Sequence, residues 1–245
     1  MDILIKKISN ILSLILIFVF SAVFYFNYKG FILTPDGNIV LKVKPAQAAE
    51  RNGIATILPK DISLNASKQF AIGSLNAPLT LYEYSSLGCP HCADFHKEII
   101  PLLKRDYVEK DLLRIVFVNF PLDKKSMKAA MISFCMTNDK YHDFIDLMFS
   151  KQKVWWLAND DDALYDYASQ LGLNRDEVTS CMNNDNIAKE IIDDRQQGIN
   201  QLYMEGTPAF LVNGKDGNEI IYGVPDYNEL KKYINSRLDR VKMEQ

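Results

Sequence analysis

The sequence predicts one α/β domain behind an N-terminal hydrophobic segment. From about residue 61 onward, segments with the apolar period of strands alternate with segments that have the period of helices, without internal repeats or heptads. A strand at 79–85, a helix after it and a second strand at 112–120 form a β-α-β unit. The composition, with 48% hydrophobic and 24% charged residues, is that of an ordinary folded protein.

The net charge of the chain limits the classes of partner that it is expected to bind. Its 28 Lys and Arg against 31 Asp and Glu give a formal net charge of -3, without the bias of disordered or collagen-like chains. Residues 1–49 hold 5 of the basic and 2 of the acidic residues, so the rest holds 23 against 29, a formal -6. Proteins that bind nucleic acids through phosphate contacts are usually basic, so we expect no nucleic-acid partner.

The N-terminus has the pattern of a targeting segment. An apolar run at 11–26 follows Lys6 and Lys7 and has no polar face. We expect residues 1–28 to be a signal peptide or a signal anchor. Ala46-Gln47-Ala48 has the small-x-small form of a cleavage site but lies well beyond the run, so both alternatives stay open. Lysines before the run keep that end in the cytoplasm, so either alternative carries the following chain across the membrane.

The remaining elements follow in chain order. Turn-forming residues between 29 and 60 predict a linker, and the domain extends over 61–245. The helix after the first strand is expected to reach Tyr107, and helical periodicity from about 126 to 182 predicts an all-helical insertion. After the insertion we expect a helix at 187–203, strands at 209–212 and 220–222 joined by a loop at 213–217, and a last helix capped by Asp226 and Glu229.

Two of the four cysteines indicate redox chemistry. Cys89 and Cys92 are separated by Pro90 and His91 at the start of a helix that follows a strand. Unpaired backbone N–H groups and the helix dipole stabilise a thiolate at Cys89, and His91 adds a donor or a positive charge. Pro90 suits the first helical position. Because stabilising the reduced form makes the disulfide more oxidising, the sequence predicts an oxidising Cys89–Cys92 disulfide.

The competing interpretation of the two cysteines is half of a zinc site. Such a site needs two further thiolate or imidazole ligands close by. His96 is four residues beyond Cys92 on the same helix, which directs its side chain along the helix and away from a metal held between the two thiols. We therefore predict neither a metal nor a cofactor in this chain.

The segment from Leu81 to Cys92, with the sequence LYEYSSLGCPHC, resembles the active-site strand and turn of the DsbA family of thiol-disulfide oxidoreductases. The resemblance covers about residues 70 to 240. It includes Ala77-Pro78 before the strand, the segment Gly206–Phe210 (GTPAF) near the end, and the helical insertion between them. It implies a thioredoxin fold with a helical insertion, in a domain that works in the periplasm.

The resemblance also implies roles for individual residues. Cys89 matches the nucleophilic cysteine, Cys92 the resolving cysteine, and Pro90 with His91 the dipeptide that tunes them. In the family, a strongly oxidising disulfide results from this turn.

Three more residues match the family outside the turn. Pro208 matches a cis-proline that faces the cysteines, and Thr207 before it matches the residue whose backbone pairs with an extended substrate. Glu83 resembles an acidic residue beneath the active site that relays a proton from the resolving thiol. The alternation of a half-buried strand would equally allow Glu83 to face solvent, so both orientations stay open.

Cys135 and Cys181 are expected to form a second, structural disulfide. They are 46 residues apart, both within the helical insertion. Spare cysteines in an oxidising compartment more often pair than stay free. Four cysteines permit three pairings, and the resemblance favours 89 with 92 and 135 with 181.

The function that follows is disulfide formation in exported proteins. A substrate thiolate attacks the disulfide at Cys89, expels Cys92, and the substrate's second thiol resolves the mixed disulfide. The resemblance implies two partners: unfolded or partly folded exported proteins with free thiols, and a membrane quinone-linked reoxidase of the DsbB type. The alternatives are a disulfide isomerase or reductase kept reduced by a membrane donor, and a non-catalytic thioredoxin-like binding module.

Overall fold

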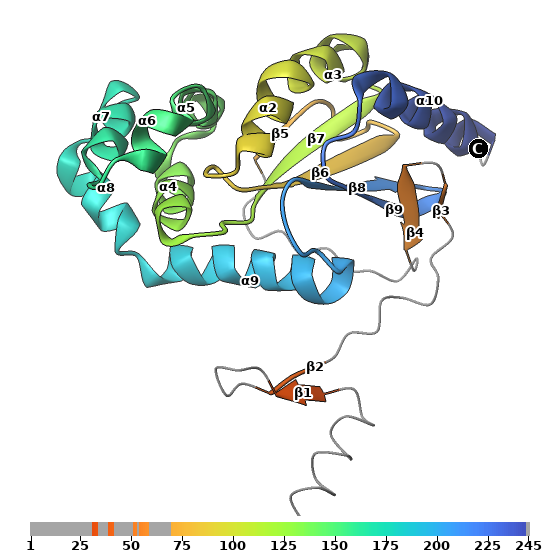
Figure 1. Cartoon of the computed structure of the whole chain (residues 1–245). Helices are drawn as coiled ribbons and strands as arrows, with labels where there is room; N and C mark the ends of the chain where they lie inside the picture. The colour runs from red at the N-terminus through yellow and green to blue at the C-terminus, as the bar shows by residue number, and fades with distance from the viewer. Residues whose placement is uncertain (1–30, 34–38, 42–50, 53, 59–69, 244–245) are drawn as a thin grey trace, which may run out of the picture. The chain divides into compact units, whose positions relative to one another are not determined.

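The structure, a computed structural model, describes residues 31–33, 39–41, 51–52, 54–58 and 70–243 (Figure 1). The chain divides into two units, at 1–48 and 49–245. In the first unit, strand β1 (Phe31–Leu33) pairs antiparallel with β2 (Ile39–Leu41). The signal peptide or anchor expected at 1–28 lies outside the described residues. Among the helices that are described, none combines the length and the apolar character needed to cross a membrane.

The second unit is built on a seven-stranded sheet with the order β3-β4-β9-β8-β6-β7-β5. Within this sheet, the interior strand β6 runs parallel to β7 and antiparallel to β8. The strands are β3 (Arg51–Asn52), β4 (Ala55–Leu58), β5 (Phe70–Ile72), β6 (Leu79–Ser85), β7 (Leu113–Asn119), β8 (Ala209–Gly214) and β9 (Gly217–Tyr222). The predicted strand at 79–85 is confirmed, and its two neighbours place its C-terminal end in the middle of the sheet edge.

Helices cover both faces of this sheet (Figure 1). Helices α2, α3 and α10 lie on one face, α9 lies along the other, and α4 to α8 form the predicted insertion at one end. The helices are α2 (Pro90–Glu98), α3 (Ile100–Asp106), the short 3-10 helix η1 (Val108–Lys110), α4 (Lys124–Cys135), α5 (Asn138–Ser150), α6 (Gln152–Leu157), α7 (Asp162–Gln170), α8 (Arg175–Met182), α9 (Asp185–Leu202) and α10 (Tyr227–Met243).

The alternation of side chains along β6 decides which residues face α2. Leu79 and Leu81 join the hydrophobic cluster under α2 and α10, whereas Tyr84 joins the cluster under α9. Because successive strand residues point to opposite faces, Glu83 shares the face of Leu81. Its side chain is fully buried. The solvent-facing orientation that the sequence left open is therefore excluded.

The helix expected to run to Tyr107 is interrupted. It ends at Glu98, Ile99 links the two parts, and α3 begins at Ile100. The reason is Pro101, which cannot donate a backbone hydrogen bond and clashes with the carbonyl one turn back. The break leaves Phe95 and Leu103 fully buried under α2 and α3.

The linker expected at 29–60 is shorter than predicted. Residues 55–58 form strand β4, which pairs antiparallel with β9 and extends the sheet. Ala55 and Leu58 are buried there. The loop expected at 213–217 is also shorter, because β8 and β9 continue to Gly214 and Gly217 and leave a two-residue turn.

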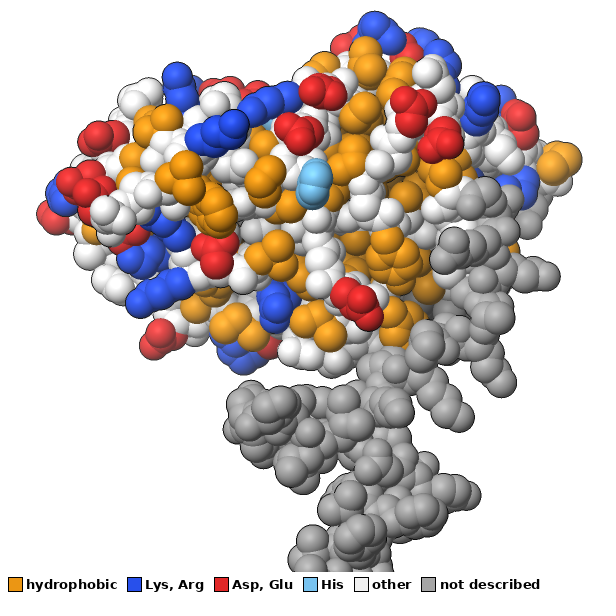
Figure 2. All heavy atoms as spheres, viewed as in Figure 1, with side chains coloured by type: hydrophobic (Ala, Val, Ile, Leu, Met, Phe, Trp, Pro, Cys, Tyr) orange, Lys and Arg blue, Asp and Glu red, His pale blue; other side chains and the backbone are white. Residues whose placement is uncertain are grey.

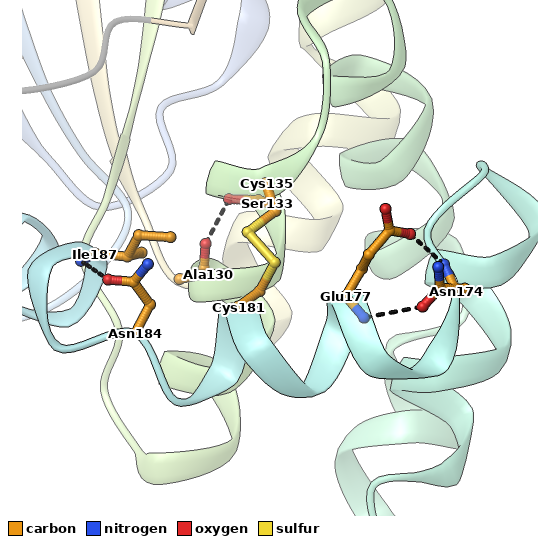
Figure 3. Close-up of a disulfide and its surroundings, with 8 residues drawn as sticks. All are labelled: Ala130, Ser133, Cys135, Asn174, Glu177, Cys181, Asn184 and Ile187. Atoms are coloured by element: carbon orange, nitrogen blue, oxygen red, sulfur yellow. Dashed lines mark hydrogen bonds between the residues drawn. A yellow bond between two sulfur atoms is a disulfide. The ribbon is translucent and has the colours of Figure 1, made fainter.

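A disulfide joins Cys135, at the end of α4, to Cys181 in the last turn of α8 (Figure 3). The two Cα atoms are 6.3 Å apart. Asn174 begins α8 with a capping box that includes Glu177, and Asn184 caps α9 directly after it. The bond thus ties together the two ends of the insertion, and its surroundings are fixed by caps at both neighbouring helix starts.

The surface carries no large single-sign area on the face drawn in Figure 2. Acidic and basic side chains are interspersed there, with hydrophobic ones between them. This agrees with the small formal charge of the chain, -3.

Candidate active site

The turn after β6 places Cys89 at the start of a helix. The backbone N–H of Cys89 donates to the Ser86 carbonyl at 3.0 Å and closes the turn. Cys89 has extended backbone angles and is the N-cap of α2, with Pro90 at the first helical position. The N–H groups of the first helical turn have no partner within the helix and point toward the N-cap. The Cys89 sulfur therefore lies where a negative charge is stabilised.

The loop before β8 lies against Cys89. The Cys89 thiol donates to the Thr207 carbonyl at 3.3 Å, across 118 positions of sequence. The Thr207–Pro208 peptide bond is cis. These two loop residues and the cysteine turn thus form one surface at the end of the central strands.

The two cysteine sulfurs have opposite electrostatic environments. The pKa of Cys89 is lowered to about 5, chiefly by a hydrogen bond from the Cys92 thiol. Burial acts against this, while Thr207 and the backbone N–H groups of Cys92 and His91 lower the pKa further. Cys92 is fully buried, and its pKa is raised by burial and then by its hydrogen bond to Cys89. Cys89 is therefore the thiolate of the pair and Cys92 the protonated thiol.

His91 contributes differently from the sequence expectation. Its side chain is exposed, and it lowers the pKa of Cys89 through its backbone N–H. The backbone at the helix start, and not the imidazole ring, therefore provides the contribution of His91 to the lowered pKa of Cys89.

Glu83 lies beneath the cysteine turn. Burial raises the pKa of its carboxyl group to about 7, and the charge of His96 and the nearby Ser85 side chain lower it less. Neither carboxylate oxygen has a hydrogen-bond partner among the described residues. Ser85 also lowers the pKa of Cys92, so its side chain lies near both groups. Glu83 and Ser85 line a small internal cavity of about 10 Å³, about the space of one water molecule. A buried carboxyl group with a pKa raised to about 7 thus lies near the buried Cys92 thiol.

His96, considered above as a zinc ligand, is engaged elsewhere. It is buried on α2, and its Nε2 lies 2.5 Å from Asp146 Oδ1 on α5. The described residues contain no group of three or more metal-binding side chains. The His96 ring therefore acts on two carboxyl groups. Its charge lowers the pKa of Glu83, and its Nε2 contacts Asp146 at the surface of the insertion.

The helical insertion packs directly against the cysteine turn. An added Cβ at Gly88 would lie 2.2 Å from the Ser126 hydroxyl oxygen and 2.8 Å from Trp156 Nε1. Only a glycine allows this approach. Trp156 is 39% exposed and its indole N–H donates to Asp123 at 3.3 Å, whereas Trp155 is fully buried. Trp156 therefore belongs to the surface around the site, and Trp155 belongs to the core of the insertion.

Sequence reasoning missed Gln152. This buried residue begins α6, and its amide donates to the Leu87 carbonyl at 2.7 Å and to the Cys89 carbonyl at 2.9 Å. Two donors directed at two carbonyls of one turn hold it firmly. No local pattern marks such a residue, because its partners lie 65 and 63 positions away.

A thiol of lowered pKa at a helix start, a buried thiol of raised pKa and a facing cis-proline loop, all on a β-α-β unit, define a thioredoxin-like redox protein. In agreement, the thioredoxin family matches residues 65–236, and the chain belongs to this family. Its structural neighbours include DsbA proteins. α-DsbA1 of Wolbachia pipientis superimposes with a TM-score of 0.66 and 25% identity, over 73% of this chain and 94% of that one.

Other relatives agree. BdbD of Bacillus subtilis, in its oxidised form, superimposes with a TM-score of 0.59 and 25% identity, over 70% of this chain and 93% of that one. Disulfide bond formation protein D of Bacillus subtilis is 25% identical over 69% of this chain and 77% of its own length. A Rickettsia felis protein with the provisional name protein-disulfide oxidoreductase is 30% identical over 58% of this chain and 52% of its length. The chain thus spans about half the length of its Rickettsia relatives.

Proposed function

We propose that this protein is a thiol-disulfide oxidoreductase that introduces disulfide bonds into exported proteins. The observation that carries the proposal is the contrast between the two sulfurs of one turn. Cys89 has a pKa lowered to about 5, and Cys92 is buried with a raised pKa. A thiolate of low pKa is a good leaving group and stabilises the dithiol form, so its disulfide is a strong oxidant. The names of the relatives support the same class of reaction.

The reaction begins from the Cys89–Cys92 disulfide. A substrate thiolate attacks Cys89 Sγ, a substrate–Cys89 bond forms, and Cys92 leaves with the electron pair of the broken bond. Because the pKa of Cys92 is raised, this sulfur takes up a proton, and the buried Glu83 carboxyl group nearby is the proposed donor. The second thiolate of the substrate then attacks the substrate sulfur that is bonded to Cys89. A disulfide forms within the substrate, and Cys89 leaves as a thiolate. The substrate loses two electrons, and the cysteine pair gains them.

The supporting residues have roles in this proposal. Pro90 and His91 set the helix start, and Thr207 with Pro208 presents backbone to an extended substrate. We propose that residues 1–28 direct export to the periplasm, as a cleaved signal or as an anchor. We further propose that a DsbB-type quinone-linked membrane protein reoxidises the dithiol. Cys135 and Cys181 hold the insertion that supports the turn.

The test is the reduction potential of the Cys89/Cys92 pair in the full chain, equilibrated in glutathione buffers. We expect a value well above that of thioredoxin, about -270 mV. A Cys135→Ser/Cys181→Ser variant serves as the control, since its potential must be the same if the measured couple is Cys89/Cys92. A potential near or below the thioredoxin value would instead identify a reductase or isomerase that a membrane donor keeps reduced.

A further inference from the structure

A pocket of about 430 Å³ opens beside the cis-proline loop. Its size is within the range of pockets that bind small ligands or side chains. One end of the pocket is formed by the two residues that face Cys89. Its lining is Tyr203, Glu205, Gly206, Thr207, Pro208, Tyr222 and Gly223.

The chemistry of the pocket is that of a cation site. Glu205 provides an exposed carboxylate, and Tyr203 and Tyr222 provide two phenol rings. Tyr222 is 48% exposed, and its hydroxyl is held by donation to the Leu202 carbonyl at 2.8 Å. Burial raises the pKa of Tyr222, and the charge of Glu205 raises it further, so the carboxylate lies close to this ring. No ion pair within the described part of the chain involves Glu205.

The pocket is also within reach of a substrate bound to Cys89. Thr207 belongs to its lining, and the Thr207 carbonyl is 3.3 Å from the Cys89 sulfur. An extended peptide advances about 3.3 Å per residue, and its alternate side chains point to the same side. A side chain about two residues from the substrate cysteine can therefore enter the pocket.

We propose that this pocket binds a lysine or arginine side chain of the substrate, about two residues from the reacting cysteine, between the Glu205 carboxylate and the rings of Tyr203 and Tyr222. Cations bind over aromatic faces, and a carboxylate in the same pocket adds an ion pair. An acidic side chain would be repelled by the Glu205 carboxylate. An apolar side chain would remove water from that carboxylate without providing a partner for its charge, which is unfavourable. The proposal rests on the proposed function, because it assigns that enzyme a preferred class of substrate.

The experiment uses the full chain in its disulfide form and three dithiol peptides. The peptides differ only at the positions two residues before and after the first cysteine, which carry Lys, Gln or Glu. The rate of peptide oxidation is measured at low and at high salt. We expect the Lys peptide to react about fivefold faster than the Gln peptide and the Glu peptide to react more slowly still. The difference should shrink at high salt.

Two variants assign the preference to the pocket. In Glu205→Gln the ratio of the Lys to the Gln rate should fall toward one, and in Glu205→Lys the preference should reverse in favour of the Glu peptide. Glu190→Gln, which removes an exposed acid of α9 outside the pocket, should keep the wild-type ratio. A reversal cannot result from loss of structure, since a misfolded variant would slow all three peptides.

The possible failures are distinct. Equal rates for the three peptides in the wild type would overturn the proposed pocket and leave the oxidoreductase in place. The same holds if Glu205→Gln and Glu190→Gln change the ratio equally, because the preference would then follow the overall charge. If no peptide is oxidised, and Cys89→Ser behaves like the wild type, the proposed function itself fails.

Discussion

The side-chain amide of Gln152 donates a hydrogen bond to the carbonyl oxygen of Cys89 at 2.9 Å. A second bond from the same nitrogen reaches the Leu87 carbonyl at 2.7 Å, so one residue of the insertion holds both sides of Gly88. The amide hydrogens are the positive end of its dipole and point at the turn that carries the Cys89 sulfur. The insertion therefore positions the cysteine turn.

The substitution Gln152→Ala should destabilise the protein and raise the pKa of Cys89. Two buried carbonyls lose their donor, at a cost of about 2 kcal/mol, and the thiolate loses part of its favourable surroundings. Denaturant unfolding measures the first effect, and ultraviolet titration of the thiolate in the reduced protein measures the second. Gln170→Ala, at the exposed end of α7, is the matched control. A loss of stability without any change in the Cys89 titration would limit Gln152 to a structural role.

The Cys89 thiolate should make the stability of the reduced protein depend on pH. Its pKa in the folded protein is lowered from 9.0 to about 5, so the folded state binds fewer protons between these values. The stabilisation is therefore fully present above pH 9 and is lost as the pH falls toward 5. The measurement is the difference in free energy of unfolding between the reduced wild type and reduced Cys89→Ser across this range. A difference that stays constant with pH would contradict a thiolate at Cys89.

The parts of the fold that the sequence predicts are those with a local cause. Strand β6 and the redox turn depend on side-chain alternation and on helix-start chemistry, which are readable within a few residues. The break at Ile99 also has a local cause, because Pro101 cannot lie inside a continuous helix. The apolar helical period continues across the break, so the period alone predicts one helix instead of two.

The remainder depends on contacts between distant segments. Strand β4 exists because β9 offers it an edge, and the four residues 55–58 alone carry too weak a pattern. The orientation of Glu83 depends on which face of β6 the helices α2 and α10 cover, and this is not visible in the local sequence. The pocket beside Pro208 joins the end of α9 to the end of β9, so neither Glu205 nor Tyr222 stands out in the sequence.

Glu83→Gln should remove a second pH dependence, of opposite sign. Burial raises the pKa of Glu83 from 4.5 to about 7, so the folded state holds a proton that the unfolded state releases. Its contribution is complete below pH 4.5 and is lost as the pH rises through about 7. Above that pH the Gln variant should therefore be more stable than the wild type. Denaturant unfolding of the disulfide form at both ends of this range measures the difference.

The same variant tests the proton path to Cys92. Gln cannot deliver a proton, so peptide oxidation by Glu83→Gln should be slower than by the wild type while the reduction potential changes little. Glu190→Gln again controls for the loss of one negative charge. An unchanged oxidation rate would show that Cys92 receives its proton by another route.

Removing the Cys135–Cys181 disulfide should lower stability and leave the redox couple intact. The bond closes a loop over 46 positions, which corresponds to about 4 kcal/mol in the chain-entropy model. The Cys135→Ser/Cys181→Ser variant should lose about this much free energy of unfolding, measured by denaturant with the Cys89–Cys92 bond formed in both proteins. The bond lies between α4 and α8, and Gln152 holds the turn from α6, so the Cys89 titration should be retained. A shifted titration would mean that the bond also sets the position of α6.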